Sequence, residues 1–394
     1  MSEPDATRTT VDLAGGPPRR TPRWLVAVAV ALVVLLVAGA VADHIELGYY
    51  ALTPGEARPV GPLVTVPRSR AHRVEGKLLL TDVYVSQVTA LAYLYDKLRS
   101  DVQVLPATTV LGPATPPSEL VVQGYLEMAQ SQAAAKAAAL TRLGYDVGEH
   151  AAGTLVFAVV AGSPAARVLH VGQVVTAVDG TPTPDVCAFS RALARRAAGD
   201  RVTLSVEQST VTAHAVLKPG RTVTEHVTLA RWPSSVPRPS PTPPCGVGVH
   251  RAQGFLGVEA ETQEDYHFPF PVTVRTTSIG GPSAGLAMTL GILDVLSGGH
   301  LTGGRTVAAT GTISPDGAVG EVGGVPEKTV AVERAGASVF FVPAAQVATA
   351  KAKATPSLTV VGVRSLAQAL DDLHRLGGTV PASPGTSPAG PQGS

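Results

Sequence analysis

Two residues in the last third of the chain have the types and surroundings needed to attack an acyl group. Ser283 lies in the run Gly280-Gly-Pro-Ser-Ala-Gly285, and Lys328 follows 45 positions later in Gly323-Gly-Val-Pro-Glu-Lys328. A serine hydroxyl is a poor nucleophile until a base removes its proton, and a lysine held in an apolar site can act as that base. The sequence therefore predicts a nucleophile at Ser283 and a general base at Lys328.

The elements around Ser283 favour this chemistry. A glycine turn precedes Ser283, and the apolar run from Ala284 to Leu296 predicts a buried helix. Free amides and the dipole at a helix N-terminus favour negative charge, which suits the oxyanion of a tetrahedral intermediate. Gly281 and Ala284 leave space for a substrate backbone. The alternative is that Ser283 only caps the helix, since serine is a favoured N-cap residue.

Lys328 is predicted to open a second helix, Thr329 to Ala335. The dipole at a helix start disfavours a cation, and desolvation acts in the same direction. Both effects lower the pKa of a lysine toward the range in which it can accept a proton from serine. A solvated lysine without any chemical role is the alternative.

Composition describes a globular chain of several domains. Its 394 residues exceed one ordinary core, so two or three domains are expected. With 31 basic and 30 acidic residues, the net charge of +1 recruits neither nucleic acid nor an anionic surface. Cys187 and Cys245 are the only cysteines. The sequence alone does not decide whether they form a disulfide. Two cysteines are too few for a thiolate zinc site, and no cofactor or metal is predicted.

Residues 24–42 form nineteen consecutive uncharged positions near the N-terminus. As a helix they span roughly 28 Å, enough to cross a bilayer. Arginines precede this run within 19–23 and Asp43 follows it, so the positive-inside rule keeps the N-terminus in the cytoplasm and everything from about Asp43 outside. A cleaved signal peptide is the main alternative, because Ala40-Val-Ala42 resembles a cleavage site. A buried core helix and a twin-arginine signal are weaker ones.

The middle of the chain resembles PDZ domains of the type associated with bacterial proteases. The resemblance covers about residues 145–231 and is carried by Gly162-Ser-Pro-Ala-Ala166 and by the run from Val171 to Gly180. It implies that an extended peptide is bound as an added strand on a sheet edge. No clear carboxylate-binding Gly-Leu-Gly-Phe run is present, so no peptide-contacting residue is named. A packing module without a ligand is the alternative.

The segment around the predicted nucleophile resembles the proteolytic domain of Lon proteases, over roughly residues 255–374. The motifs that carry this resemblance are Gly281–Gly285, Leu301–Gly304, Ala309–Thr312, Asp316–Gly320, Gly323–Gly324, Glu327–Lys328 and Arg334–Ala337. It implies Ser283 as nucleophile, Lys328 as base and later as acid for the leaving amine, and Thr310 as a hydroxyl that orients the lysine. Many Lon enzymes carry an acidic residue three positions before the serine, where this chain has Gly280.

In this order the segments resemble the single-pass membrane PDZ and Lon-like proteases of Gram-positive, actinobacterial type. That resemblance implies an α+β multidomain fold with a transmembrane helix, a β-rich PDZ domain and a Lon-like α/β domain of the ribosomal S5 domain 2 type. The expected divisions are a cytoplasmic N-terminus 1–23, a transmembrane helix 24–42, a mixed extracytoplasmic region 43–144 with a helix at 127–143, a PDZ domain 145–231, a proline-rich linker 232–246, a proteolytic domain 247–376 and a disordered tail 377–394.

The expected activity is ATP-independent cleavage of accessible or unfolded polypeptides outside the membrane. No Gly-x-x-x-x-Gly-Lys-Ser/Thr loop occurs in the sequence, so no phosphate cradle for ATP is evident. The expected partners are polypeptide substrates, peptide termini or segments at the PDZ domain, and the membrane through the N-terminal helix. Nucleic acid is not expected as a partner. The oligomeric state stays open, with a homo-oligomer among the options.

Three other functions are compatible with parts of this sequence. Gly281–Gly285 also matches the Gly-x-Ser-x-Gly motif of α/β-hydrolases, for which His300 or His374 would serve as base, but such a sheet needs more βα units than this segment contains. Small-molecule kinases share the general fold of Lon-like domains but lack a lysine in this context. An inert PDZ and Lon-like scaffold that binds membrane partners is the non-enzymatic alternative.

Overall fold

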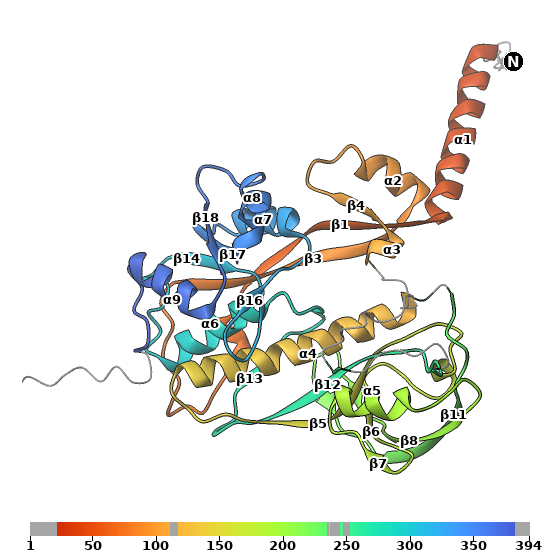
Figure 1. The fold of residues 1–394 in the computed structure, drawn as a ribbon. Coiled ribbons are helices and arrows are strands. Elements are labelled where there is room, and N and C mark those ends of the chain that lie inside the picture. Colours follow the sequence, from red (N-terminus) through yellow and green to blue (C-terminus); the bar gives the residue numbers. More distant parts are fainter. Residues whose placement is uncertain (1–21, 111–116, 235, 237–244, 247–252, 383–394) are drawn as a thin grey trace, which may run out of the picture.

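The computed structural model describes residues 22–110, 117–234, 236, 245–246 and 253–382. Most of the expected N-terminal segment, of the proline-rich linker and of the C-terminal tail lies outside these residues. Within them, the apolar run near the N-terminus forms α1 (Arg23–His44), a helix without buried residues that projects from the body of the molecule (Figure 1). By length and composition α1 can cross a membrane, a test that a signal sequence also passes.

A six-stranded mixed sheet organises the lobe nearest α1 (Figure 1). Its strands, in spatial order, are β18 (Thr359–Val363), β17 (Val339–Pro343), β14 (Thr306–Ala309), β3 (Lys77–Thr89), β1 (Glu46–Pro59) and β4 (Gln103–Pro106). β14 runs parallel to β3 and β17, whereas β1 is antiparallel to β3 and β4. The strands of the mixed region expected at 43–144 therefore share one sheet with strands from the segment expected as the proteolytic domain.

Helices cover both faces of the sheet. One core gathers around α6 (Gly285–Leu296) and includes the inner face of α9 (Leu366–Arg375), and the other includes α7 (Val325–Arg334) and α8 (Val347–Lys351). Successive side chains of a strand point to opposite faces, so Leu78 and Leu80 of β3 join the first core and Leu79 joins the second. Burial on both faces explains the continuous apolar run in β3.

The remaining short elements lie in the connecting segments of both lobes. They are β2 (Val64–Thr65), β13 (Thr273–Val274), β15 (Thr312–Ile313), β16 (Val319–Gly320), α2 (Ala90–Asp96), α3 (Ala107–Val110) and the single-turn 3-10 helices Gly61–Leu63, Ala165–Arg167 and Ala344–Gln346. β13 pairs with β2, and β15 pairs with β16.

The second lobe is a smaller β-rich unit with its own core. Its strands, in spatial order, are β11 (Thr222–Thr228), β8 (Arg201–Glu207), β6 (Val174–Val178), β5 (Gly148–Val159) and β12 (Val258–His267). A short strand, β7 (Thr181–Pro182), pairs with β6. The lobe also contains a separate hairpin of β9 (Thr210–Val211) and β10 (Leu217–Lys218) and the helix α5 (Val186–Ala194). β12 pairs with β5 although it follows the linker. The chain segment expected within the proteolytic domain thus supplies an edge strand of this lobe.

The helix α4 (Pro117–Arg142) lies between the two lobes (Figure 1). It begins well before position 127, where the helix was expected. Leu126 packs with side chains of β5 and β6, while Met128 and Ala135 pack in the core around α6. One helix therefore contacts both hydrophobic cores.

A disulfide joins Cys187 of α5 to Cys245, which settles the question that the sequence left open. The bond closes a loop of 58 positions around the β-rich lobe. A cross-link of this kind stabilises a protein mainly by restricting the unfolded chain, and more so for long loops.

We expect the double variant Cys187→Ala/Cys245→Ala to lose about 4 kcal/mol of unfolding free energy in this lobe, because the loop entropy is no longer restricted. Urea unfolding followed by the fluorescence of Trp232 measures this. A reductant should shift the wild-type midpoint similarly and leave the variant unchanged. An unshifted midpoint in the variant would contradict the stabilising role.

Candidate active site

Ser283 lies in the turn before α6, and its carbonyl oxygen is held twice. The Gly311 amide donates to it over 2.9 Å, and Thr310 Oγ1 donates to it over 3.1 Å. The N-cap residue of α6 is Ala284, and no side chain caps this helix. The capping role considered for Ser283 is therefore wrong, and its hydroxyl is left for another partner.

That partner is Lys328. Its Nζ lies 2.7 Å from Ser283 Oγ and 3.4 Å from Thr310 Oγ1. Lys328 belongs to the first turn of α7, which begins at Val325 and so starts earlier than the predicted Thr329. The structure brings the three predicted polar residues together at the end of β14 and the starts of α6 and α7. Such a crevice at the carboxyl end of parallel strands commonly holds a ligand site.

The two histidines considered as bases lie elsewhere. His300 Nδ1 is 3.1 Å from Glu75 Oε2, and His374 Nδ1 is 3.3 Å from the carbonyl oxygen of Gly378. Neither has a hydrogen bond to Ser283 in the described part of the chain. The hydrolase arrangement with a histidine base is thus not formed.

Burial controls the charge of Lys328. The residue is only 2% exposed, and none of the ion pairs among the described residues includes it. Desolvation lowers the pKa of its amine from 10.5 to about 8, although the charges of Asp82 and Glu327 raise it. A substantial fraction of the amine is therefore neutral near physiological pH and can accept a proton.

Gly324 allows the start of α7, and with it Lys328, to lie close to the sheet. Gly324 is the N-cap of α7 and has a φ of +67°, a left-handed conformation that favours glycine. A Cβ at this position would lie 2.8 Å from Val83 Cγ1 on β3. The missing side chain lets the start of α7 rest directly against the sheet.

The turn that carries Ser283 is supported by α4, which the sequence did not reveal. The Gly281 amide donates to the Gly124 carbonyl over 2.8 Å, and Ser131 Oγ donates to the Pro282 carbonyl over 3.0 Å. A Cβ on Gly280 would lie 3.1 Å from the Cα of Gly124. A side chain at position 280, where many Lon enzymes carry an acidic residue, would therefore require the backbone of Gly124 to shift by a few tenths of an ångström. The only sequence signal was two small residues, Gly124 and Ser131, seven positions apart on one helical face.

Two backbone donors remain beside the hydroxyl. Among the described residues, the amides of Ser283 and Ala284 have no hydrogen-bond acceptor, whereas the next amide, of Gly285, donates to the Pro282 carbonyl. Unpaired amides before a helix attract negative charge. They can serve as donors to an oxyanion formed next to Ser283 Oγ.

A cavity of 290 Å³ adjoins the Ser283 turn. Its apolar walls come from four side chains, namely Ala134, Phe157, Pro282 and Ile313. Glu127 and Glu261 also line it, and burial, together with the charge of Glu261, raises the pKa of Glu127 to about 7. The cavity offers a mixed surface that could hold one large substrate side chain.

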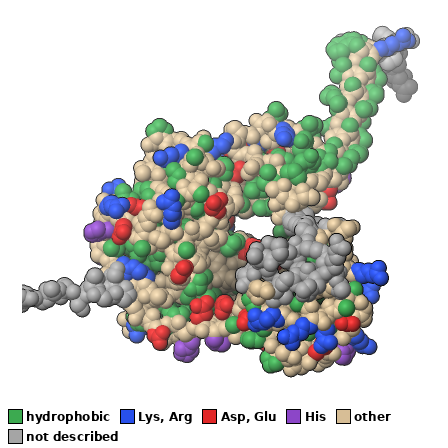
Figure 2. All heavy atoms as spheres, viewed as in Figure 1, with side chains coloured by type: hydrophobic (Ala, Val, Ile, Leu, Met, Phe, Trp, Pro, Cys, Tyr) green, Lys and Arg blue, Asp and Glu red, His purple; other side chains and the backbone are tan. Residues whose placement is uncertain are grey.

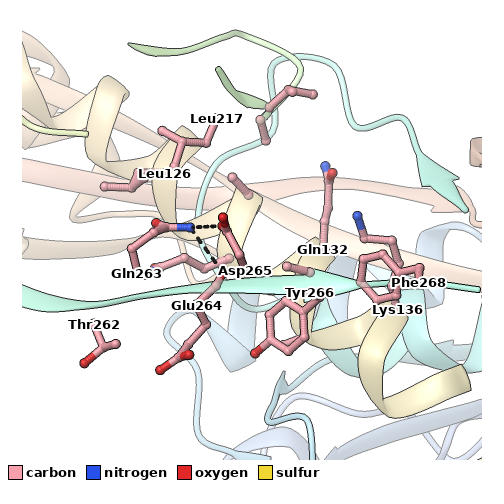
Figure 3. A pocket seen from close by; sticks show the side chains of 16 residues that line it. Leu126, Gln132, Lys136, Leu217, Thr262, Gln263, Glu264, Asp265, Tyr266 and Phe268 are labelled. Carbon is pink, nitrogen blue, oxygen red and sulfur yellow. Dashed lines mark hydrogen bonds between the residues drawn. The ribbon is translucent and has the colours of Figure 1, made fainter. Parts of the chain in front are cut away.

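A second cavity, of 390 Å³, lies between α4 and β12 (Figure 3). Gln263 Nε2 donates to Asp265 Oδ1 within it over 3.2 Å, and Lys136 Nζ lies 4.9 Å from the ring centroid of Phe268. None of the Ser283, Thr310 and Lys328 side chains lines this cavity. In the described part of the chain, no group of three or more His, Cys, Asp or Glu side chains is placed to hold a metal ion.

Comparison with known proteins bears on this site. Residues 249–372 match the family model of the Lon protease (S16) C-terminal proteolytic domain. The chain is 40% identical over 89 residues to the Lon protease of Methylocella silvestris, covering 23% of this chain and 11% of that protein. It is 33% identical over 109 residues to Lon protease 2 of Bacillus subtilis, covering 28% and 19%. The mitochondrial Lon protease homolog of Mus musculus matches at 34% over 97 residues, covering 24% and 10%.

These matches support a serine peptidase of the Lon type in the C-terminal part of the chain. The chain covers between a tenth and a fifth of the length of these three curated relatives. Among solved structures, the PDZ domain of the SdrC-like protein from Listeria monocytogenes aligns with 28% of this chain and 87% of its own, at 17% identity and a TM-score of 0.20. A likeness of that size does not by itself assign a fold.

The reactivity of Ser283 should rise with pH, since only the neutral amine of Lys328 accepts a proton. With a pKa lowered to about 8, the rate of Ser283 acylation by a fluorophosphonate should increase about tenfold per pH unit below 8 and level off above it. Labelling rates between about pH 6 and pH 9 test this. A flat profile would contradict the role of Lys328 as base.

Replacing Gly280 by Ala should disturb the nucleophile without touching it. The new methyl group pushes against the backbone of Gly124, so we expect the acylation rate of Ser283 to fall by roughly tenfold. Gly323→Ala is the matched control, since a Cβ there meets nothing within 4 Å. Equal labelling of the two variants would show that the contact with α4 does not position the serine.

Proposed function

We propose that this chain is a membrane-anchored serine endopeptidase that cleaves extracytoplasmic or membrane-proximal polypeptides without ATP. The observation that carries the proposal is the 2.7 Å contact between the buried amine of Lys328 and Ser283 Oγ. It lies in the segment that matches the Lon proteolytic domain. A nucleophile and a base in hydrogen-bond contact, with a third group against the base, form the arrangement that covalent catalysis requires.

In the first half of the reaction, Ser283 Oγ attacks the carbonyl carbon of the scissile peptide bond and the neutral amine of Lys328 takes the hydroxyl proton. The negative oxygen of the tetrahedral intermediate accepts hydrogen bonds from the Ser283 and Ala284 amides. When the carbon–nitrogen bond breaks, Lys328 gives the proton to the leaving amine. The products are a free N-terminus and an ester on Ser283.

In the second half, water attacks the ester and Lys328 accepts its proton. The second intermediate collapses, the proton returns to Ser283 Oγ and a carboxylic acid leaves. Thr310 supports both halves, because its hydroxyl lies 3.4 Å from Lys328 Nζ while it donates to the Ser283 carbonyl. Thr310 therefore keeps the distance between Lys328 and Ser283 constant.

We also propose that the β-rich lobe selects substrates as a PDZ domain. The run Gly254-Phe-Leu-Gly257 directly precedes β12, and a cavity of 270 Å³ lies between it and α5, where Phe189 and Leu193 line the wall. β12 is the last strand of its sheet, and no described strand pairs with its outer edge. An extended peptide can add to such an edge through backbone hydrogen bonds. This run follows the proline-rich linker and therefore lies outside the bounds 145–231 that the sequence predicts for the domain.

Membrane anchoring and the absence of an ATP requirement rest on further observations. α1 is long and apolar enough to span a bilayer, and three arginines at positions 19–23 precede or begin it. The positive-inside rule then places both lobes outside. Without a phosphate-binding loop in the sequence, no ATP-driven unfolding is proposed, so the substrates are accessible or already unfolded segments.

Purified full-length protein in detergent micelles should cleave unfolded casein without ATP. Ser283→Ala and Lys328→Met should each reduce the rate by about a thousandfold or more, since a nucleophile and its base act as a unit. Ser297→Ala and Lys351→Met are matched controls away from the site and should cleave like the wild type.

Two readouts make this experiment decisive. Lys328→Met removes a buried amine, so its unfolding midpoint should rise while its activity is lost, which excludes unfolding as the cause. Equal cleavage by all variants would overturn the dyad. No cleavage and no acylation of Ser283 in the wild type would favour the inert scaffold, and a strict need for ATP would refute ATP independence.

A further inference from the structure

A short helix close to α1 presents its apolar face to the outside. Leu91, Leu94, Tyr95 and Leu98, on α2 and the turn that follows it, are 44%, 67%, 64% and 88% exposed. Their spacing of three and four positions places them on one helical face. A helix in a water-soluble protein buries such a face, yet nothing in the described part of the chain covers this one.

The position of this apolar face relative to α1 is fixed by hydrogen bonds. The amide of Ala90, the first residue of α2, donates to the carbonyl of Ile45, one residue after α1 ends. Thr89 Oγ1 donates to Asp43 Oδ1 over 3.3 Å, so the N-cap of α2 is also joined to the last turn of α1. Figure 1 shows α2 beside the end of α1 that joins the body. Any bilayer crossed by α1 therefore has its surface at α2.

The surroundings of the face are those of a membrane interface. Tyr49 and Tyr93 pack with ring centroids 5.3 Å apart, and Lys97 Nζ lies 5.4 Å from the Tyr93 centroid. Aromatic rings are enriched at the headgroup level, and lysine can reach lipid phosphates while its stem stays in apolar surroundings. In Figure 2 apolar side chains cover α1, and more of them lie on the neighbouring surface of the body.

We propose that Leu91, Leu94, Tyr95 and Leu98 form a second membrane contact, which lies in the interfacial layer of the bilayer that α1 crosses. The proposal rests on the membrane anchoring proposed above. A lipid surface fits better than a second copy of the chain, because the face is continuous with α1. Four side chains are also far fewer than the roughly 20 to 30 residues per partner of a stable protein interface.

This contact would set the orientation of the catalytic lobe. A single helix leaves a protein free to tilt and rotate about its anchor, whereas two contacts restrict both motions. α2 follows β3 directly, and β3 pairs with β1 and β14 in the sheet that carries the site. The height of Ser283 above the lipid would then be nearly constant, which favours substrates whose scissile bond lies at that height.

The test uses the full chain with one fluorescent thiol probe at a time, in vesicles with or without brominated acyl chains. Both natural cysteines are in the disulfide, so an introduced cysteine is the only free thiol. The probes are placed by Leu98→Cys and Leu94→Cys on the apolar face, Leu35→Cys on α1, and Val216→Cys as an exposed apolar control on the other lobe. Labelling of Ser283 verifies that each variant is folded.

Brominated lipid should reduce the emission of the probes at 94, 98 and 35 to about half or less, and leave the probe at 216 unchanged. Quenching at 35 without quenching at 94 and 98 would overturn the second contact and keep the anchor. Quenching at 94 and 98 alone would refute the anchor and, with it, the proposal of a second contact in a bilayer that α1 crosses. Self-quenching between labelled copies, without an effect of bromine at 94 and 98, would assign the face to a second chain and overturn the proposal.

Discussion

Folding removes Lys328 from water without placing it in an ion pair among the described residues, although the more distant charges of Asp82 and Glu327 still act on it. The side chain is 2% exposed, and no carboxylate in the described part of the chain pairs with it. The fall of its pKa from 10.5 to about 8 corresponds to about 3 kcal/mol against the charged form. The cores on both faces of the sheet must supply this free energy. In return, the fold keeps an amine that can accept a proton at neutral pH.

The rest of the site follows from where this amine lies. Parallel strands end at one edge of the sheet, so the residue after β14 and the first turns of α6 and α7 meet there. Thr310 and Gly311 hold the Ser283 carbonyl from the strand side, and α4 holds the preceding turn from the other side. Ser283 is thus fixed by its backbone, while its hydroxyl remains directed to Lys328.

Local patterns in the sequence were sufficient to predict three polar residues that the structure brings together, but not the parts that hold them. Ser283, Thr310 and Lys328 sit in glycine-rich turns next to apolar helices, and such signals span only a few positions. The contribution of Gly124 and Ser131 was hidden, because α4 is rich in alanine on all sides and periodicity does not show which face contacts the turn. The placement of β12 in the other lobe was missed as well. Strand pairing across a linker leaves no local trace in composition.

The large sequence distance between the segments that form the site also affects when the site is assembled during folding. β14 pairs with β3 across the entire β-rich lobe, so the sheet closes only after contacts between very distant segments form, which is the slowest kind of event in folding. In an unfolded chain the lysine has a pKa of about 10.4, and fewer than about one in a thousand is neutral at pH 7. In the folded protein, with a pKa of about 8, roughly a tenth is neutral. If Lys328 is the base of Ser283, as proposed, a nascent or partly unfolded copy carries a mostly protonated lysine and a correspondingly unreactive serine.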